Sequence, residues 1–170
     1  MSFVFEHHDP ETYRRKARII SVAMAGQLIV FGLVFSQLLV TVFGSSLWLN
    51  ALGVFLGLLA TSMTFAVLRE RPWMREMRYV WQLKHHLSRL SGYLATLRRE
   101  TEQGNGVALH LMTAYHQGMA QLAELNGRTL DDDSELIGER ARIRRLREER
   151  GLPVQVEGFD PHDLAAFKRS

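Results

Sequence analysis

The longest pattern in the chain is an apolar run over residues 19–68. These fifty consecutive positions contain no Asp, Glu, Lys, Arg or His. A helix that crosses a bilayer needs about 20 mostly apolar residues, and a stretch of about 18 without charge already indicates one. The run is therefore long enough for two membrane-spanning helices and a tight turn.

Turn residues divide this run into two parts. Gly44, Ser45 and Ser46 form its only convincing turn, so we predict spans over 19–43 and 47–68. At about 1.5 Å per residue the two helices measure about 33–37 Å, enough to cross a hydrocarbon core of about 30 Å with some tilt. The run greatly exceeds the roughly 7–15 apolar residues of a cleaved signal peptide, so we expect a retained membrane hairpin.

Lys and Arg predict the orientation of the hairpin. Cations flank both spans, and the turn between the spans has none. The positive-inside rule then predicts that both termini are cytoplasmic and that the turn faces outward. The flanking cations are Arg14, Arg15, Lys16 and Arg18 before the first span, and Arg69, Arg71, Arg75 and Arg78 after the second.

Residues after the hairpin show helical periodicity. Apolar positions between Val80 and Leu97 are separated alternately by three and four residues, which is a heptad-like seam. A similar seam runs from Ala108 to Leu122, and a glycine-containing breaker at 104–106 separates the two. Matching seams on both sides of a short loop predict an antiparallel helical hairpin.

The predicted fold class is all-α: a two-helix transmembrane hairpin, then a cytoplasmic helical hairpin, then a further amphipathic Arg-rich helix. The expected parts are an N-terminal arm (1–18), the membrane hairpin (19–68) and a cytoplasmic region (69–170). Helices in that region are expected over about 72–103, 107–126 and 134–150, with a short helix in the tail. Aspartates at 131–133, with Ser134, supply N-cap chemistry for the helix over 134–150.

Small residues line one face of the predicted second span. Gly53, Gly57 and Thr61 are four residues apart, and such a groove lets helix backbones approach closely. Two arrangements remain open: the groove pairs two copies of the chain, or it receives the first span of the same chain. Buried polar groups such as Gln27 are expected to hydrogen-bond between the two spans.

The helix over 134–150 is rich in arginine. Arg140, Arg144 and Arg147 are the candidates for contact with an anionic surface, which would be lipid headgroups, nucleic acid or an acidic protein. Glutamates are interleaved with these arginines, so the competing interpretation is a solvated face that pairs its own charges. The whole chain carries a net charge of only +3, and we expect no nucleic-acid partner.

The sequence shows no pattern typical of catalysis. The chain has no cysteine, and its seven histidines lack the spacing of metal ligands. Nucleophile elbows and phosphate-binding loops are also absent. No residue is therefore predicted to be catalytic, to bind a cofactor or to ligate a metal.

Several strings along the chain resemble a known family. In order they are Tyr13-Arg14, Ser36-Gln37-Leu38-Leu39 before Phe43-Gly44, Leu49-Asn50-Ala51-Leu52-Gly53-Val54, Tyr79-Val80-Trp81-Gln82-Leu83-Lys84, and Tyr115-His116-Gln117-Gly118 leading to Leu122-Ala123-Glu124-Leu125. Together they are similar to a bacterial inner-membrane family known as domain of unknown function 3087. The resemblance implies two spans followed by a cytoplasmic helical region in a bacterial plasma membrane. It implies no activity, cofactor or catalytic residue.

Two functions follow from these observations. The first is a non-enzymatic, membrane-anchored interaction or scaffold module, whose cytoplasmic helices bind a protein partner or a second copy. The alternative is a membrane-surface enzyme, or enzyme subunit, that acts on an anionic or lipid-like substrate. A transporter is third, because two spans without intramembrane charge would have to assemble into an oligomer to form a pathway.

Overall fold

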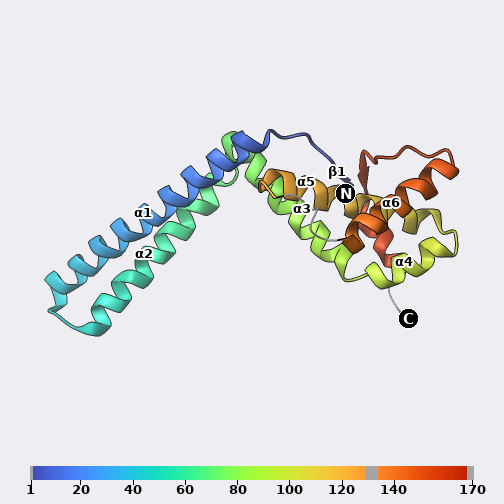
Figure 1. The fold of residues 1–170 in the computed structure, drawn as a ribbon. Helices are drawn as coiled ribbons and strands as arrows, with labels where there is room; N and C mark the ends of the chain where they lie inside the picture. The colour runs from blue at the N-terminus through green and yellow to red at the C-terminus, as the bar shows by residue number, and fades with distance from the viewer. Residues whose placement is uncertain (1, 129–133, 168–170) are drawn as a thin grey trace. The chain divides into compact units, whose positions relative to one another are not determined.

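The computed structural model describes residues 2–128 and 134–167, and these residues are mostly helical, which confirms the all-α prediction (Figure 1). Contacts divide the chain into two compact units. The first, Thr12–Arg78, is called here the apolar hairpin. The second joins Met1–Glu11 with Tyr79–Ser170 and is called the helical domain.

Two long helices make up most of the apolar hairpin. Helices α1 (Pro10–Phe43) and α2 (Leu47–Leu68) lie side by side, and a tight turn connects them (Figure 1). Both are long and apolar enough to cross a membrane. Helix α2 covers the residues predicted for the second span. Helix α1 begins well before residue 19, because Pro10 is suited to the first helical position and the polar residues after it continue the helix.

Small residues bring α1 and α2 into close contact. A Cβ atom on Gly57 would lie 2.6 Å from the backbone nitrogen of Gly32, and one on Gly53 would lie 2.4 Å from the Cα of Ser36. Thr61 is buried beside them, and its hydroxyl donates to the carbonyl oxygen of Gly57 at 2.8 Å. Of the two arrangements that the sequence left open, the structure has the groove receiving the first span of the same chain.

Side-chain hydrogen bonds also join α1 and α2. The amide nitrogen of Gln27 donates to the hydroxyl of Thr64 at 2.8 Å, and the hydroxyl of Ser36 donates to Asn50 Oδ1 at 2.7 Å. These two bonds satisfy polar groups within the apolar run, as the sequence predicted for Gln27.

The outer surface of the hairpin is apolar. In the most apolar 18-residue stretch of each helix, only 6% of α1 and 17% of α2 is buried inside the chain. Leu33 on α1 is 67% exposed, for example, and Trp48 on α2 is 83% exposed. A core helix of a water-soluble protein buries such residues, so the hairpin lacks the partner that its apolar surface requires.

Four helices form the body of the helical domain. They are α3 (Arg75–Ser91), α4 (Leu94–Glu102), α5 (Gly106–Leu125) and α6 (Ser134–Glu149). Two short 3₁₀ turns, η1 (Pro72–Met74) and η2 (Pro161–Phe167), lie before α3 and in the tail. The aspartates at 131–133 that were predicted to cap α6 lie outside the described residues.

The single helix predicted over 72–103 is wrong, because the structure divides this segment into η1, α3 and α4. The chain leaves the helical conformation at Tyr93, where φ is −113° and ψ is 2°. Gly92 precedes it, and glycine is among the weakest helix formers, so the heptad-like spacing continues across a helix break. At the start of α5, the side chain of Asn105 accepts hydrogen bonds from two backbone N–H groups.

The predicted seams do form the core of the helical domain. Leu83 and Leu90 on α3, and Leu97 on α4, are fully buried. Gly118 on α5 brings α3 close, since a Cβ atom there would lie 2.8 Å from Leu87 Cδ2.

A small antiparallel sheet joins the two ends of the chain, and the sequence did not predict it. Strand β1 (Phe3–Val4) pairs with β2 (Gly158–Phe159), with Phe3 opposite Phe159. Gly158 permits the pairing, because a Cβ atom there would lie 2.2 Å from the carbonyl oxygen of Phe3. The segment Met1–Glu11 therefore belongs to the same compact unit as Tyr79–Ser170.

Candidate functional site

Polar side chains on one face of α5 hold both terminal segments. The amide of Gln117 pairs with the backbone of Val156: it donates to the carbonyl oxygen at 2.9 Å and accepts from the N–H at 3.0 Å. One turn later, Gln121 donates to the carbonyl oxygen of Glu6 at 2.6 Å. Side chains of α5 thereby form hydrogen bonds with backbone groups of two segments that lie outside the helices.

Tyr79 on α3 completes the hold on the N-terminal segment. Its hydroxyl accepts from the backbone N–H of Glu6 at 3.1 Å and donates to Gln121 Oε1 at 2.7 Å. Burial raises the pKa of Tyr79, so its hydroxyl stays protonated and able to donate at neutral pH.

An aromatic cluster lies behind these hydrogen bonds. The ring of Phe3 stacks on Tyr79, with centroids 5.6 Å apart, and lies 5.1 Å from the ring of His86. His86 also contacts Phe159 from the other strand. Burial, followed by the nearby His85 and Arg89, lowers the pKa of His86 below its ordinary 6.5, so the cluster favours a neutral imidazole.

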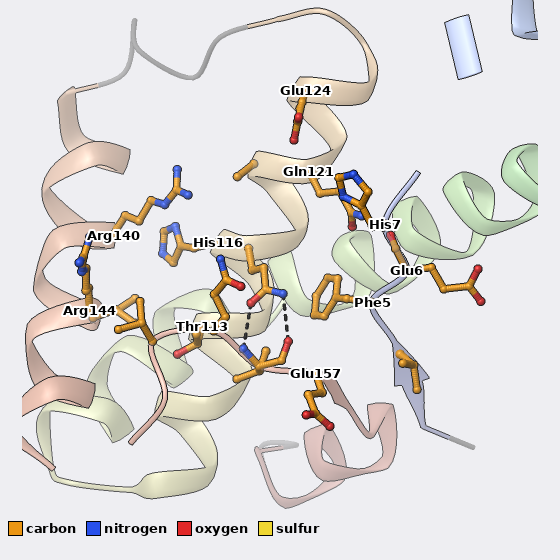
Figure 2. A pocket seen from close by; sticks show the side chains of 17 residues that line it. Phe5, Glu6, His7, Thr113, His116, Gln121, Glu124, Arg140, Arg144 and Glu157 are labelled. Carbon is orange, nitrogen blue, oxygen red and sulfur yellow. Dashed lines mark hydrogen bonds between the residues drawn. The ribbon is translucent and has the colours of Figure 1, made fainter. Parts of the chain in front are cut away.

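A cavity of about 800 Å³ opens between α5, α6 and the two terminal segments (Figure 2). We call it the α5–α6 cavity. Its volume lies within the range of about 300–1,000 Å³ that is typical of small-molecule sites. Its lining includes Phe5, Thr113, His116, Arg140, Ile143 and Arg144, and also the three glutamates Glu6, Glu124 and Glu157.

A charged network supports one wall of this cavity. His116 on α5 is only 4% exposed, and its Nε2 atom lies 3.1 Å from Glu139 Oε2 on α6. Arg98 on α4 binds both oxygens of the same carboxylate. Burial is the largest cause of a lowered pKa of His116; Glu139 raises the pKa and Arg140 and Arg98 lower it, so the net shift is downward and His116 is mainly neutral at pH 7.

The three predicted anion-contact arginines have different surroundings. Arg147 was a wrong candidate, because it is 4% exposed and donates to the Pro153 carbonyl oxygen and to the hydroxyl of Thr113. Arg144 lies at the cavity but pairs with Glu148 at 2.9 Å. Arg140 lines the cavity and has no ion pair with a described residue.

The groove residues Gly53, Gly57 and Thr61 lie in the apolar hairpin and contribute nothing to this cavity. The sequence did not predict that Tyr79, Gln117 and Gln121 act together to bind the terminal segments. Two of them occur in the strings that carry the family resemblance, but no local pattern links them to Glu6 or to Val156. Residues 2–128 and 134–167 contain no group of three His, Cys, Asp or Glu side chains arranged to hold a metal ion.

A family model described as a protein of unknown function, DUF3087, matches residues 3–164. The chain belongs to DUF3087. The match begins at the first residue of β1 and ends inside η2. It therefore includes the sheet, helices α1 to α6 and the residues that line the α5–α6 cavity. No curated protein and no solved structure matches this DUF3087 chain.

Proposed function

We propose that the chain is a two-span protein of the bacterial inner membrane, and that its helical domain is a cytoplasmic, non-enzymatic interaction module. The apolar hairpin anchors the module in the bilayer. The module itself is built from segments that flank the hairpin on both sides in the sequence.

One observation carries the topology of this proposal. Strand β1 precedes both apolar helices in the sequence and β2 follows them, yet the two strands pair directly. Phe5 extends this contact by donating its backbone N–H to the carbonyl oxygen of Glu157 at 2.8 Å. Two segments can pair in this way only on one side of a membrane, so the pairing supports an even number of crossings between them.

The hairpin surface supports two crossings rather than none. Its exposed apolar side chains would be unfavourable in water, at a cost of roughly 25 cal/mol for each Å². Cations occur at both ends of the apolar run and not in the turn, which favours a cytoplasmic location for the helical domain.

The outer face of α3 supports the role in protein interactions. Trp81 is 68% exposed and stacks on His85, with centroids 5.9 Å apart and ring planes at 11°. Arg78, Lys84 and Arg89 are exposed on the same helix, and residues 77–91 contain no acidic residue. An exposed tryptophan among cations suits an acidic protein partner.

A topology measurement tests the proposal. A reporter enzyme that is active only in the periplasm should be silent when fused after Ser170 and active when inserted at Ser45. Activity of the Ser170 fusion, or silence at Ser45 in a stably inserted protein, would contradict the proposed orientation. Trp81→Ala should reduce co-purification of a partner from native membranes, whereas Trp73→Ala, which changes an exposed tryptophan outside the proposed face, should not.

The α5–α6 cavity favours a second candidate, a membrane-surface enzyme that acts on an anionic or lipid-like substrate. His116 lines the cavity and has the carboxylate of Glu139 and the guanidinium of Arg98 behind it. An activity that is lost in His116→Gln and retained in His85→Gln would support this alternative over the non-enzymatic module.

A further inference from the structure

Arg140 differs from every neighbouring arginine. Six arginines lie between residues 140 and 150, and five of them have partners within the described chain. Those five are Arg142 with Glu102, Arg144 with Glu148, Arg145 with Glu149, Arg147 with the Pro153 carbonyl, and Arg150 with the Gly104 carbonyl. Arg140 has no such partner among described residues, although it lines the α5–α6 cavity.

The charged side chains that line the cavity point in different directions. In Figure 2 the side chain of Arg140 extends from α6 toward His116, while the carboxylates of Glu6 and Glu157 point away from the cavity. Glu124 lies at one end of the opening. The carboxylates of Glu6 and Glu157 thus point outward, whereas the guanidinium of Arg140, an exposed residue, lies beside His116 at the cavity.

The other walls of the cavity provide apolar surface. Phe5 extends toward the middle of the cavity from the N-terminal segment (Figure 2). Ile143 is 5% exposed and lies one helical turn after Arg140, and Val154 from the C-terminal segment also lines the space. Cationic and apolar groups thus face the same partly enclosed volume.

We propose that the α5–α6 cavity binds a small organic anion, whose carboxylate or phosphate group contacts Arg140 and whose apolar part lies against Phe5, Ile143 and Val154. A charge-assisted hydrogen bond from a guanidinium to a carboxylate or phosphate is roughly twice as strong as a hydrogen bond between neutral groups. The source of the anion is either a water-soluble compound or a lipid headgroup, since both carry this chemistry. The inference goes beyond the anchoring role and does not depend on the orientation of the hairpin.

The pKa of His116 should change when an anion binds at Arg140, even if the anion does not contact His116. Burial is the largest cause of its lowered pKa; Arg140 and Arg98 lower the pKa further, and Glu139 opposes them. An anion bound to Arg140 would offset the repulsion between Arg140 and an imidazolium, so it would raise the pKa of His116.

A nuclear magnetic resonance titration of the full chain tests the proposal. The protein is purified in neutral detergent with ¹³C-labelled histidine, and loss of a signal in His116→Gln assigns that residue. The soluble probe is phenyl phosphate, and the lipid probe is dihexanoyl phosphatidylglycerol. Inorganic phosphate serves as an anion without an apolar part.

At least one organic probe should raise the pKa of His116 in a saturable manner, by about one unit. The probe that succeeds identifies the source of the anion. Arg140→Gln should weaken this binding at least about tenfold, the effect expected for loss of a charge-assisted hydrogen bond. Arg142→Gln is the matched control, because Arg142 is exposed and paired with Glu102, and it should bind like the wild type.

Three results would each overturn the proposal. They are the absence of a saturable change with both organic probes, an equal change in Arg140→Gln with an unchanged circular dichroism spectrum, and inorganic phosphate binding as tightly as the organic probes.

Discussion

On α2, Leu47 is 84% exposed and Trp48 is 83% exposed, whereas Leu83 on α3 is fully buried within its own domain. Both helices are rich in large apolar residues, but they differ in periodicity. The apolar positions of α3 recur every three or four residues between polar ones, while α2 carries large apolar residues on all sides and only a few small polar ones. A one-sided stripe needs another helix as partner, whereas a helix with apolar residues on all sides needs burial on all sides, in a protein core or in a membrane.

The two units also differ in what joins their helices. In the apolar hairpin, glycines allow the α1 and α2 backbones to touch, and small polar groups bond across the contact. In the helical domain, leucine side chains fill the space between helices, and glutamines tie down the irregular ends. In the proposed membrane location, lipid would provide no hydrophobic force between helices, and close packing would replace it in the hairpin.

The largest effect is expected from a substitution that disrupts the core of the helical domain. Leu83→Asp would place a carboxylate where the wild-type side chain is fully buried, at a cost on the order of 4 kcal/mol. Limited proteolysis of the full chain in detergent should show cleavage within residues 79–128 while the hairpin stays intact. Trp81→Ala, on the exposed face of the same helix, is the control; wild-type resistance in Leu83→Asp would contradict the packed core.

The next effect tests the hairpin surface. Leu33 is 67% exposed and faces lipid in the proposed topology, so Leu33→Arg would place a charge in contact with lipid. Such a substitution near the middle of a span costs roughly 2.5–3.5 kcal/mol of insertion free energy. Alkaline extraction of membranes should release more of this variant than of Val42→Arg, which lies near the turn. Equal retention of both variants would mean that this face does not meet lipid.

A smaller effect distinguishes close helix contact from lipid exposure within the hairpin. A leucine at residue 57 would overlap the backbone of Gly32, and overpacking of this kind costs about 1–3 kcal/mol. Gly57→Leu should make the hairpin sensitive to protease in detergent. Gly26→Leu is the matched control, because a Cβ atom there meets nothing within 4 Å. If both variants resist protease equally, the groove does not hold the hairpin together.

The smallest effect concerns pH, and it should appear in the helical domain but not in the apolar run over residues 19–68. The pKa values of His86 and His116 lie below the ordinary 6.5, so the unfolded domain binds more protons than the folded one in mildly acidic solution. The stabilising contribution of these neutral imidazoles is complete above about pH 6.5 and is lost as the pH falls toward their lowered values.

Melting of the helical domain should therefore occur at a lower temperature at pH 5.5 than at pH 7. The apolar run over residues 19–68 contains no ionisable side chain, so the protease resistance of this run should not change over the same range. His116→Gln should reduce the pH dependence of the domain. A larger decrease in that variant would contradict the assigned sign.

The sequence by itself determined the helical class, the apolar hairpin and the seams of the core, because these depend on the spacing of apolar residues along one helix. It also located the groove at Gly53, Gly57 and Thr61. It did not determine which helix fills that groove, since two copies and one chain would present the same small-residue pattern.

Tertiary structure alone decided how the helical domain is closed and where its cavity lies. Strand β1 is two residues long and pairs with residues more than 150 positions away, so no local pattern reports it. Arg140 and Arg147 look alike in the sequence, yet one faces a cavity and the other is buried against Pro153. Their difference depends on which elements pack against α6, and packing across long sequence separations leaves no trace in the periodicity of one helix.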